Sequence, residues 1–368
     1  MWIAATLALV VVATLLWRGS DAAATASTTA TPAGVPVGAP AAAVSPAWSA
    51  GSDPMPEDVV ESGRILVASE HGVRALDPLT GEEAWHYSRS NAQLCDVAVT
   101  SGVAVAVFRT QDRCDEAVAL DADTGVRQWT RNVSFAGEVV LESTDSIVLA
   151  VAEKSLVTLD PVNNNVRWRY ETPERCRLLD AEAGDAGIVL MQRCSGSPAV
   201  QLRLLDGFEG SARWSRDLPA VTDEEVRLLG ADRVVGVEFG GDLQLLGGAD
   251  GAPLRTLPTA DDAQMTSVGV AVLLRLDGIL RAYDPASAQL LWETPAHGLP
   301  TAPPVPKEGD GAGVLMIPEA SGFVPRDALT GERRGEPSAA DDLPSGGLAS
   351  AVGPVVVHQL GDEVVAYR

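Results

Sequence analysis

The chain has few basic residues. Its 368 residues include 27 Lys and Arg against 50 Asp and Glu, which gives a formal net charge of −23 at pH 7. Binding to the phosphate backbone of a nucleic acid depends on clustered Lys and Arg, so we expect no nucleic-acid partner. The acidic balance instead favours solubility and partners that are cationic or neutral.

The sequence also lacks the short motifs of common enzymes. It contains no GxSxG, HExxH or P-loop pattern. It has no CxxC pair, and its four histidines are scattered, so zinc ligation is not expected. Asp121, Asp123 and Gly125 resemble the opening of a calcium loop, but the downstream glutamate is missing. We therefore expect no catalytic, metal-binding or cofactor-binding residues.

Charge is absent from residues 2–17, WIAATLALVVVATLLW. As a helix this run spans about 24 Å, shorter than the ~30 Å hydrocarbon core of a bilayer. That length suits a short membrane anchor or the core of a signal peptide, although no positive stretch precedes it. We expect residues 1–18 to be an uncleaved anchor of an exported protein. Cleavage in AAATAS (22–27), followed by secretion, stays open as the alternative.

Residues 19–46 contain Ala, Ser, Thr, Pro and Gly with almost no charge. Such a stretch has few large apolar groups to bury, so burial cannot offset the entropy lost on ordering. We expect a flexible tether here, followed by one folded domain over 47–368.

The folded part repeats one line of sequence, in which an aspartate precedes a tryptophan by eight residues. The five copies pair Asp77 with Trp85, Asp121 with Trp129, Asp160 with Trp168, Asp206 with Trp214, and Asp284 with Trp292. Degenerate copies stand at 245–255 and 325–335, so that the aspartate position recurs every 37–46 residues. A period of about 40–45 residues is typical of propeller blades.

One unit, residues 102–131, shows what each copy builds. VAVAVF and AVAL have the composition of buried strands, DADTG is turn chemistry, and VRQWTR alternates around its tryptophan. Together with the preceding CDVAVTSG, these segments predict four antiparallel strands. The sequence therefore predicts an all-β, eight-bladed propeller of four-stranded antiparallel blades, preceded by one apolar helix.

The eighth unit ends the chain after three strands, LASAVG, PVVVHQL and EVVAYR. Closing the ring protects sheet edges that would otherwise aggregate. Trp48 belongs to no other copy, so we expect residues around 44–52 to supply the missing strand. Removal before residue 45 should then leave stability intact, whereas deletion through residue 55 should not.

The repeated residues have structural interpretations. We expect each tryptophan to pack between neighbouring blades and each aspartate to cap its turn. We expect Cys95 and Cys176 to begin the first strand of a blade, and Cys114 and Cys194 to end the second. Because such ends adjoin in a hairpin, we expect the disulfides Cys95–Cys114 and Cys176–Cys194, in agreement with export.

The pattern (A/T)LDxxTGxxxW resembles the repeat of the quinoprotein-dehydrogenase-like propellers, called PQQ-like repeats. ALDPLTGEEAW (75–85) and ALDADTGVRQW (119–129) match it most fully, and the resemblance covers residues 60–368. Enzymes of this family bind pyrroloquinoline quinone with calcium and carry two adjacent cysteines over the cofactor. No two cysteines are adjacent here, so the resemblance implies the fold and not the dehydrogenase activity.

The family also contains non-catalytic scaffolds of the cell envelope. We expect this chain to be such a scaffold, tethered to the membrane and bound to an envelope protein of unknown identity. A sensor of small molecules or envelope polymers, or a PQQ-dependent dehydrogenase, are the alternatives. The candidate contact surfaces are the long loop 297–313 and the acidic stretches 221–226, 259–264 and 339–344.

Overall fold

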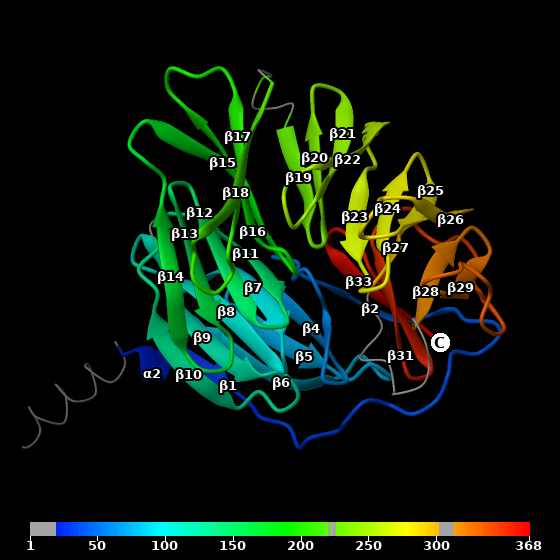
Figure 1. Ribbon diagram of the computed structural model, residues 1–368. Helices are drawn as coiled ribbons and strands as arrows, with labels where there is room; N and C mark the ends of the chain where they lie inside the picture. Colours follow the sequence, from blue (N-terminus) through cyan, green and yellow to red (C-terminus); the bar gives the residue numbers. More distant parts are fainter. Residues whose placement is uncertain (1–19, 136, 220–221, 223–225, 302–312) are drawn as a thin grey trace, which may run out of the picture.

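The computed structural model describes residues 20–135, 137–219, 222, 226–301 and 313–368, and it is almost entirely β-structure (Figure 1). Its strands form eight small sheets arranged in a ring. The predicted eight-bladed propeller is therefore confirmed. The expected apolar helix over residues 1–18 lies outside the described residues. Within the described part of the chain, no helix has the length and apolar character needed to cross a membrane.

The first four blades follow one another along the chain, each numbered from its innermost strand outward. Blade 1 contains β3 (Val60–Glu61), β4 (Arg64–Ser69), β5 (Gly72–Leu76) and β6 (Glu83–Arg89). Blade 2 contains β7 (Gln93–Thr100), β8 (Val103–Thr110), β9 (Arg113–Asp121) and β10 (Arg127–Asn132). Blade 3 contains β11 (Val139–Thr144), β12 (Ile147–Ala152), β13 (Ser155–Asp160) and β14 (Asn165–Glu171). Blade 4 contains β15 (Cys176–Gly184), β16 (Gly187–Cys194), β17 (Val200–Leu205) and β18 (Ala212–Leu218).

The remaining blades complete the ring. Blade 5 contains β19 (Val226–Ala231), β20 (Val234–Phe239), β21 (Asp242–Gly247) and β22 (Pro253–Pro258). Blade 6 contains β23 (Gln264–Ser267), β24 (Val272–Leu276), β25 (Ile279–Tyr283) and β26 (Leu290–Pro295). Blade 7 contains β28 (Val314–Glu319), β29 (Gly322–Asp327) and β30 (Ser338–Ala339). Blade 8 contains β31 (Leu348–Val352), β32 (Val355–Gln359), β33 (Glu363–Tyr367) and β2 (Pro46–Gly51).

The strand β2 closes the ring, as the sequence predicted. It pairs antiparallel with β33, and Trp48 lies opposite Ala366. The first and last parts of the folded domain therefore share blade 8.

Three details depart from a ring of identical four-stranded blades. A short strand, β1 (Thr25–Ser27), adds to the outer edge of blade 1 beside β6. Strand β27 (Leu299–Pro300) pairs in parallel with β31 of blade 8. The sheet of blade 7 has three strands among the described residues.

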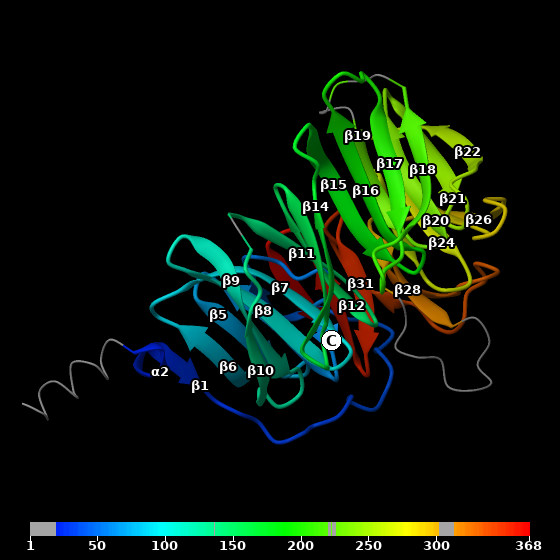
Figure 2. The ribbon, with the colours of Figure 1, turned by 60° about the vertical axis from the view of Figure 1, so that its left-hand side comes forward.

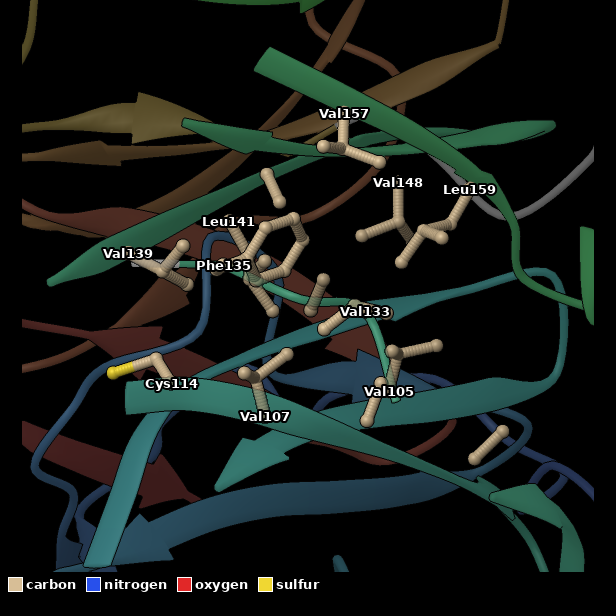
Figure 3. Close-up of a cluster of buried hydrophobic side chains, with 14 of the residues drawn as sticks. Val105, Val107, Cys114, Val133, Phe135, Val139, Leu141, Val148, Val157 and Leu159 are labelled. Carbon is tan, nitrogen blue, oxygen red and sulfur yellow. The ribbon is translucent and has the colours of Figure 1, made fainter. Parts of the chain in front are cut away.

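The hydrophobic core lies between neighbouring blades. The middle strand β8 reads VAVAVFRT, and its first six residues are buried because both of its faces are covered. Figure 3 shows one such layer, in which Val105 and Val107 of blade 2 face Val148 and Val157 of blade 3. Phe135, from the linker between these blades, fills the space between them. Each blade is thus held by its neighbours.

The expectation of a flexible tether over 19–46 is wrong for its described part. Residues 20–45 follow the outside of the propeller from blade 1 to blade 8, along the lower side in Figures 1 and 2. We call this segment the strap. It begins with α2 (Asp21–Ala24) and β1. Backbone hydrogen bonds hold it, for example from Ala30 N–H to the Thr124 carbonyl at 2.9 Å, so it needs few large apolar side chains.

Candidate interaction surface

The propeller has two distinct faces. In each regular blade, the turn between the first two strands and the aspartate-containing turn lie on one side of the ring, because neighbouring strands are antiparallel. We call this side the turn face. The turn between the second and third strands and the linker to the next blade lie on the opposite side, which we call the linker face.

The repeated tryptophans join six pairs of neighbouring blades across the turn face. Each indole N–H donates to the carbonyl of the residue that follows the turn aspartate, or its equivalent, in the next blade. The six bonds, of 2.9–3.1 Å, run from Trp48 to Pro78, Trp85 to Ala122, Trp129 to Pro161, Trp168 to Gly207, Trp214 to Gly248 and Trp292 to Ala328. A satisfied donor on a large ring fixes both the distance and the angle between two blades.

The repeated aspartates shape the turns that receive these rings. In Asp77, Asp160, Asp206, Asp284 and Asp327, one carboxylate oxygen accepts backbone N–H groups two and three residues later. In Asp121 the carboxylate accepts the N–H of Thr124, three residues later, at 2.9 Å. Hydrogen bonds from Arg213 and from the turn N–H groups lower the pKa of Asp206, so the ionised carboxylate belongs to the turn.

Two joints lack the tryptophan. Arg255 takes its place in blade 5, where it donates to the Ala288 carbonyl at 3.0 Å and lies over the Tyr283 ring at 5.4 Å. Between blades 7 and 8 the rings of Phe323 and Tyr367 meet at 5.1 Å. The sequence places Arg255 at the tryptophan position of the copy at 245–255 but did not indicate its contacts, and Phe323 and Tyr367 lie outside the repeated aspartate–tryptophan pair.

Both expected cysteine pairs form disulfides, Cys95–Cys114 in blade 2 and Cys176–Cys194 in blade 4. Cys176 and Cys194 lie opposite each other on β15 and β16. The expected position of Cys114 at the end of the second strand is wrong. Strand β8 ends at Thr110, a tight turn follows, and Cys114 belongs to the third strand, β9. The disulfide of blade 2 therefore joins its first and third strands.

Carboxylates from several blades meet near the axis of the ring. Asp96 of blade 2 accepts the N–H of Leu141 in blade 3 at 2.7 Å. Asp180 of blade 4 likewise accepts the N–H of Leu228 in blade 5 at 3.0 Å. Each of these aspartates follows an irregularity in its own strand pairing. These two hydrogen bonds connect the innermost strands of neighbouring blades, which do not pair with each other in a sheet.

Glu142 and Glu182 lie among these carboxylates. Burial and, after it, the nearby carboxylates of Glu57 and Glu182 raise the pKa of Glu142 to about 9. Burial and the nearby Asp180 raise the pKa of Glu182 to about 8. Both side chains are therefore mainly protonated at neutral pH. The sequence did not indicate this cluster, because its members lie in separate blades and in the segment before blade 1.

The axis does not match the quinone site that the enzymes of the family possess. Pyrroloquinoline quinone is an anion, and the acidic side chains near the axis, whether protonated or ionised, supply no positive charge to bind it. The described residues contain no group of three or more His, Cys, Asp or Glu side chains arranged to hold a metal ion. The four cysteines are joined within two separate blades rather than as adjacent pairs.

Two of the predicted acidic stretches lie on the linker face. Residues 259–263 connect blades 5 and 6, and residues 340–347 connect blades 7 and 8. The side chains of Asp261, Asp341 and Asp342 are exposed there. Most of the stretch 221–226 and most of the long loop 297–313 lie outside the described residues.

Comparison with known proteins supports this assignment of the fold. The family model described as outer membrane protein assembly factor BamB matches residues 41–138 and 114–368. No curated protein matches the chain by sequence. The similar solved structures described next are at most 14% identical. The likeness to the first of them, whose TM-score is 0.51, shows the fold alone.

The computationally designed Ika8 protein has a TM-score of 0.51 at 14% identity, covering 84% of this chain and 94% of its own. BamB from Moraxella catarrhalis has a TM-score of 0.49 at 14% identity, covering 88% of this chain and 99% of its own. The quinohemoprotein alcohol dehydrogenase ADHIIG from Pseudomonas putida HK5 has a TM-score of 0.48 at 12% identity, covering 88% and 76%.

Proposed function

Because the chain belongs to the family of outer membrane protein assembly factor BamB, we propose that it is a non-catalytic scaffold of the cell envelope. In this proposal the N-terminal residues tether it to a membrane on the extracytoplasmic side. The linker face binds a protein partner. Two disulfides support an oxidising compartment, where such bonds form and persist.

The observation that carries the proposal is the set of tryptophan hydrogen bonds that connect the blades. Six tryptophan bonds of one geometry join successive blades. A framework of this kind holds its surface loops in fixed places, and loops on rigid scaffolds commonly bind partners. It serves recognition without requiring any reactive group.

The linker face suits a partner better than the turn face. The strap crosses the turn face at Arg64, which donates to the Thr31 carbonyl at 3.2 Å, and at Gly353, which lies against Pro36. The linker face carries the connections between blades and the exposed Asp261, Asp341 and Asp342. With a net charge of −23, the protein favours a partner whose contact surface is basic.

The test compares two triple variants in which the same amount of charge is removed. One carries Asp261→Asn, Asp341→Asn and Asp342→Asn on the linker face. The control carries Glu82→Gln, Glu209→Gln and Glu332→Gln, three exposed carboxylates of the turn face. Each chain, starting at residue 20, is used to capture proteins from an envelope extract, and captured proteins are identified by mass spectrometry.

We expect one envelope protein to bind the native chain and the turn-face control alike. The linker-face variant should bind it about tenfold more weakly at low salt, and less so at high salt, because the lost interaction is electrostatic. A partner lost only with the turn-face variant would overturn the choice of face. Recovery of the propeller alone from every extract would overturn the proposal that the protein is a scaffold.

A further inference from the structure

The strap is attached to blade 1 at its very beginning. Strand β1 pairs antiparallel with β6, so that Thr25 lies opposite Arg89 and Ser27 opposite Tyr87. One carboxylate oxygen of Asp21 accepts hydrogen bonds from Arg89 Nη2 and from Asn91 Nδ2, both at 2.8 Å. The outer edge of blade 1 thus holds the chain from Asp21 onward.

The site for Asp21 is built into the propeller. The Arg89 side chain is only 2% exposed, and its other terminal nitrogen pairs with Glu116 of blade 2 at 2.6 Å. Glu116 therefore holds the Arg89 side chain through a contact that does not involve the strap. A charge-assisted bond to a guanidinium that is already held in place loses little entropy when it forms.

Beyond β1, the strap is held at further points. Ala30 N–H donates to Thr124 in blade 2, and Gly34 lies against Gly63 in blade 1. Val44 N–H donates to Ala339 of blade 7 at 2.8 Å, just before β2 begins. The strap is therefore held against the propeller at both ends and in its middle.

The predicted anchor, residues 1–18, ends two positions before Ser20. The Ser20 carbonyl already accepts the N–H groups of Ala23 and Ala24, at 3.1 and 3.2 Å. Two residues extend at most about 7 Å. A membrane anchor over 1–18 would therefore bring the edge of blade 1 to the lipid surface.

We propose that the outer edge of blade 1 is the part of the propeller that contacts the membrane surface. This proposal rests on the membrane tethering proposed above. Blade 5, on the opposite side of the ring of eight, points away from the membrane. The linker 259–263, which follows blade 5, is then accessible to partners that are not embedded in the bilayer. The strap sets this orientation, because it fixes where the chain leaves the propeller.

Fluorescence quenching on vesicles tests the orientation with the full chain. The four native cysteines are all in disulfides, so an introduced cysteine supplies the free thiol for labelling. Glu70→Cys and Asp242→Cys place a fluorophore near exposed turns on the linker face of blade 1 and blade 5. The labelled chains are reconstituted into phosphatidylcholine vesicles with spin-labelled headgroups, and the vesicles are isolated by flotation.

We expect at least a twofold greater quenching at position 70 than at position 242. Equal quenching at the two positions in floated protein would overturn the orientation while leaving the tether intact. Failure of the protein to float, or a mature chain that begins beyond residue 27, would instead overturn the tethering itself.

A second variant tests whether the strap sets the orientation. Asp21→Ala removes an exposed side chain, and Arg89 keeps its partner Glu116, so the propeller should fold normally. We expect flotation to remain unchanged and quenching at position 70 to fall towards that at position 242. Unchanged quenching in this variant would show that Asp21 does not determine the orientation of the propeller on the membrane.

Discussion

The indole ring of Trp48 lies directly against Gly81, so that a Cβ added to this glycine would meet Trp48 Cγ at 2.7 Å. Trp48 comes from the strand that closes the ring, and Gly81 from the aspartate turn of blade 1. The same close approach recurs four times, between Gly125 and Trp85, Gly210 and Trp168, Gly251 and Trp214, and Gly331 and Trp292. The closing joint therefore uses the same contact as the other blades.

This contact predicts that Gly81→Ala destabilises the propeller beyond the usual cost of replacing a turn glycine. Gly81 has φ +71°, and Gly278 has φ +70° with open space around it. Both substitutions incur the left-handed backbone cost of about 1–2 kcal/mol. Gly81→Ala also displaces the Trp48 ring, at a further ~1–3 kcal/mol.

Thermal unfolding followed by circular dichroism compares the two variants. The melting temperature of Gly81→Ala should fall below that of Gly278→Ala by several degrees. Equal melting temperatures would mean that the Trp48 ring moves aside freely and that the closing joint is loosely packed.

The strap predicts a different result from the one expected of a flexible tether. A chain of residues 44–368 keeps β2 but loses the strap's contacts with Thr124, Arg64 and Asp123. Each net hydrogen bond contributes about 0.5–1.5 kcal/mol, offset in part by the entropy of the released chain. We expect 44–368 to unfold at lower urea concentration than 20–368, and a chain starting at 56 to lose the cooperative transition.

The repeat made most of the fold predictable, because each aspartate–tryptophan copy specifies a turn, an outer strand and a joint. Counting copies gave the number of blades, and an eighth unit without an outer strand pointed to β2. Trp48 identified that strand because it fits no other copy. These inferences depend on spacing along the chain, which a single sequence shows directly.

The strap and the axial carboxylates were not predictable in the same way. Low hydrophobicity in residues 19–46 indicated disorder, but backbone bonds such as Ala30 to Thr124 hold the strap in place. Glu142 looks like an ordinary solvent-facing position of a strand. Its neighbours Glu57, Asp96 and Glu182 come from other parts of the ring, so only closure of the ring reveals the cluster.

The disulfides predict a redox-sensitive stability. Cys95–Cys114 and Cys176–Cys194 close loops with sequence separations of 19 and 18 residues. Loops of this length give a stabilisation of about 3 kcal/mol each in the chain-entropy model. We expect a thiol reductant to lower the melting temperature of the native chain. The variant with alanine at all four cysteines should have a lower melting temperature than the native chain without reductant, and the reductant should not change it.

Glu142 predicts that stability decreases from acid towards alkaline pH. Burial and nearby carboxylates raise the pKa of Glu142 from 4.5 to about 9 in the folded protein. Between these values the folded state retains a proton that the unfolded state releases, so folding weakens as pH rises. The contribution is fully present below pH 4.5 and is lost progressively up to about pH 9. Glu142→Gln, which is neutral at every pH, removes this dependence.

Melting temperatures between pH 5 and pH 9 test the effect. The melting temperature of the Glu142→Gln variant should match that of the native chain near pH 5 and exceed it at pH 8. The difference at pH 8 should correspond to more than about 1 kcal/mol in the free energy of unfolding, because one unit of pKa shift corresponds to about 1.4 kcal/mol. Glu174→Gln, at an exposed linker position, is the control and should follow the native curve. If the two variants followed the same curve, Glu142 would have to be ionised in the folded protein, with a cation or water screening it from Glu57 and Glu182.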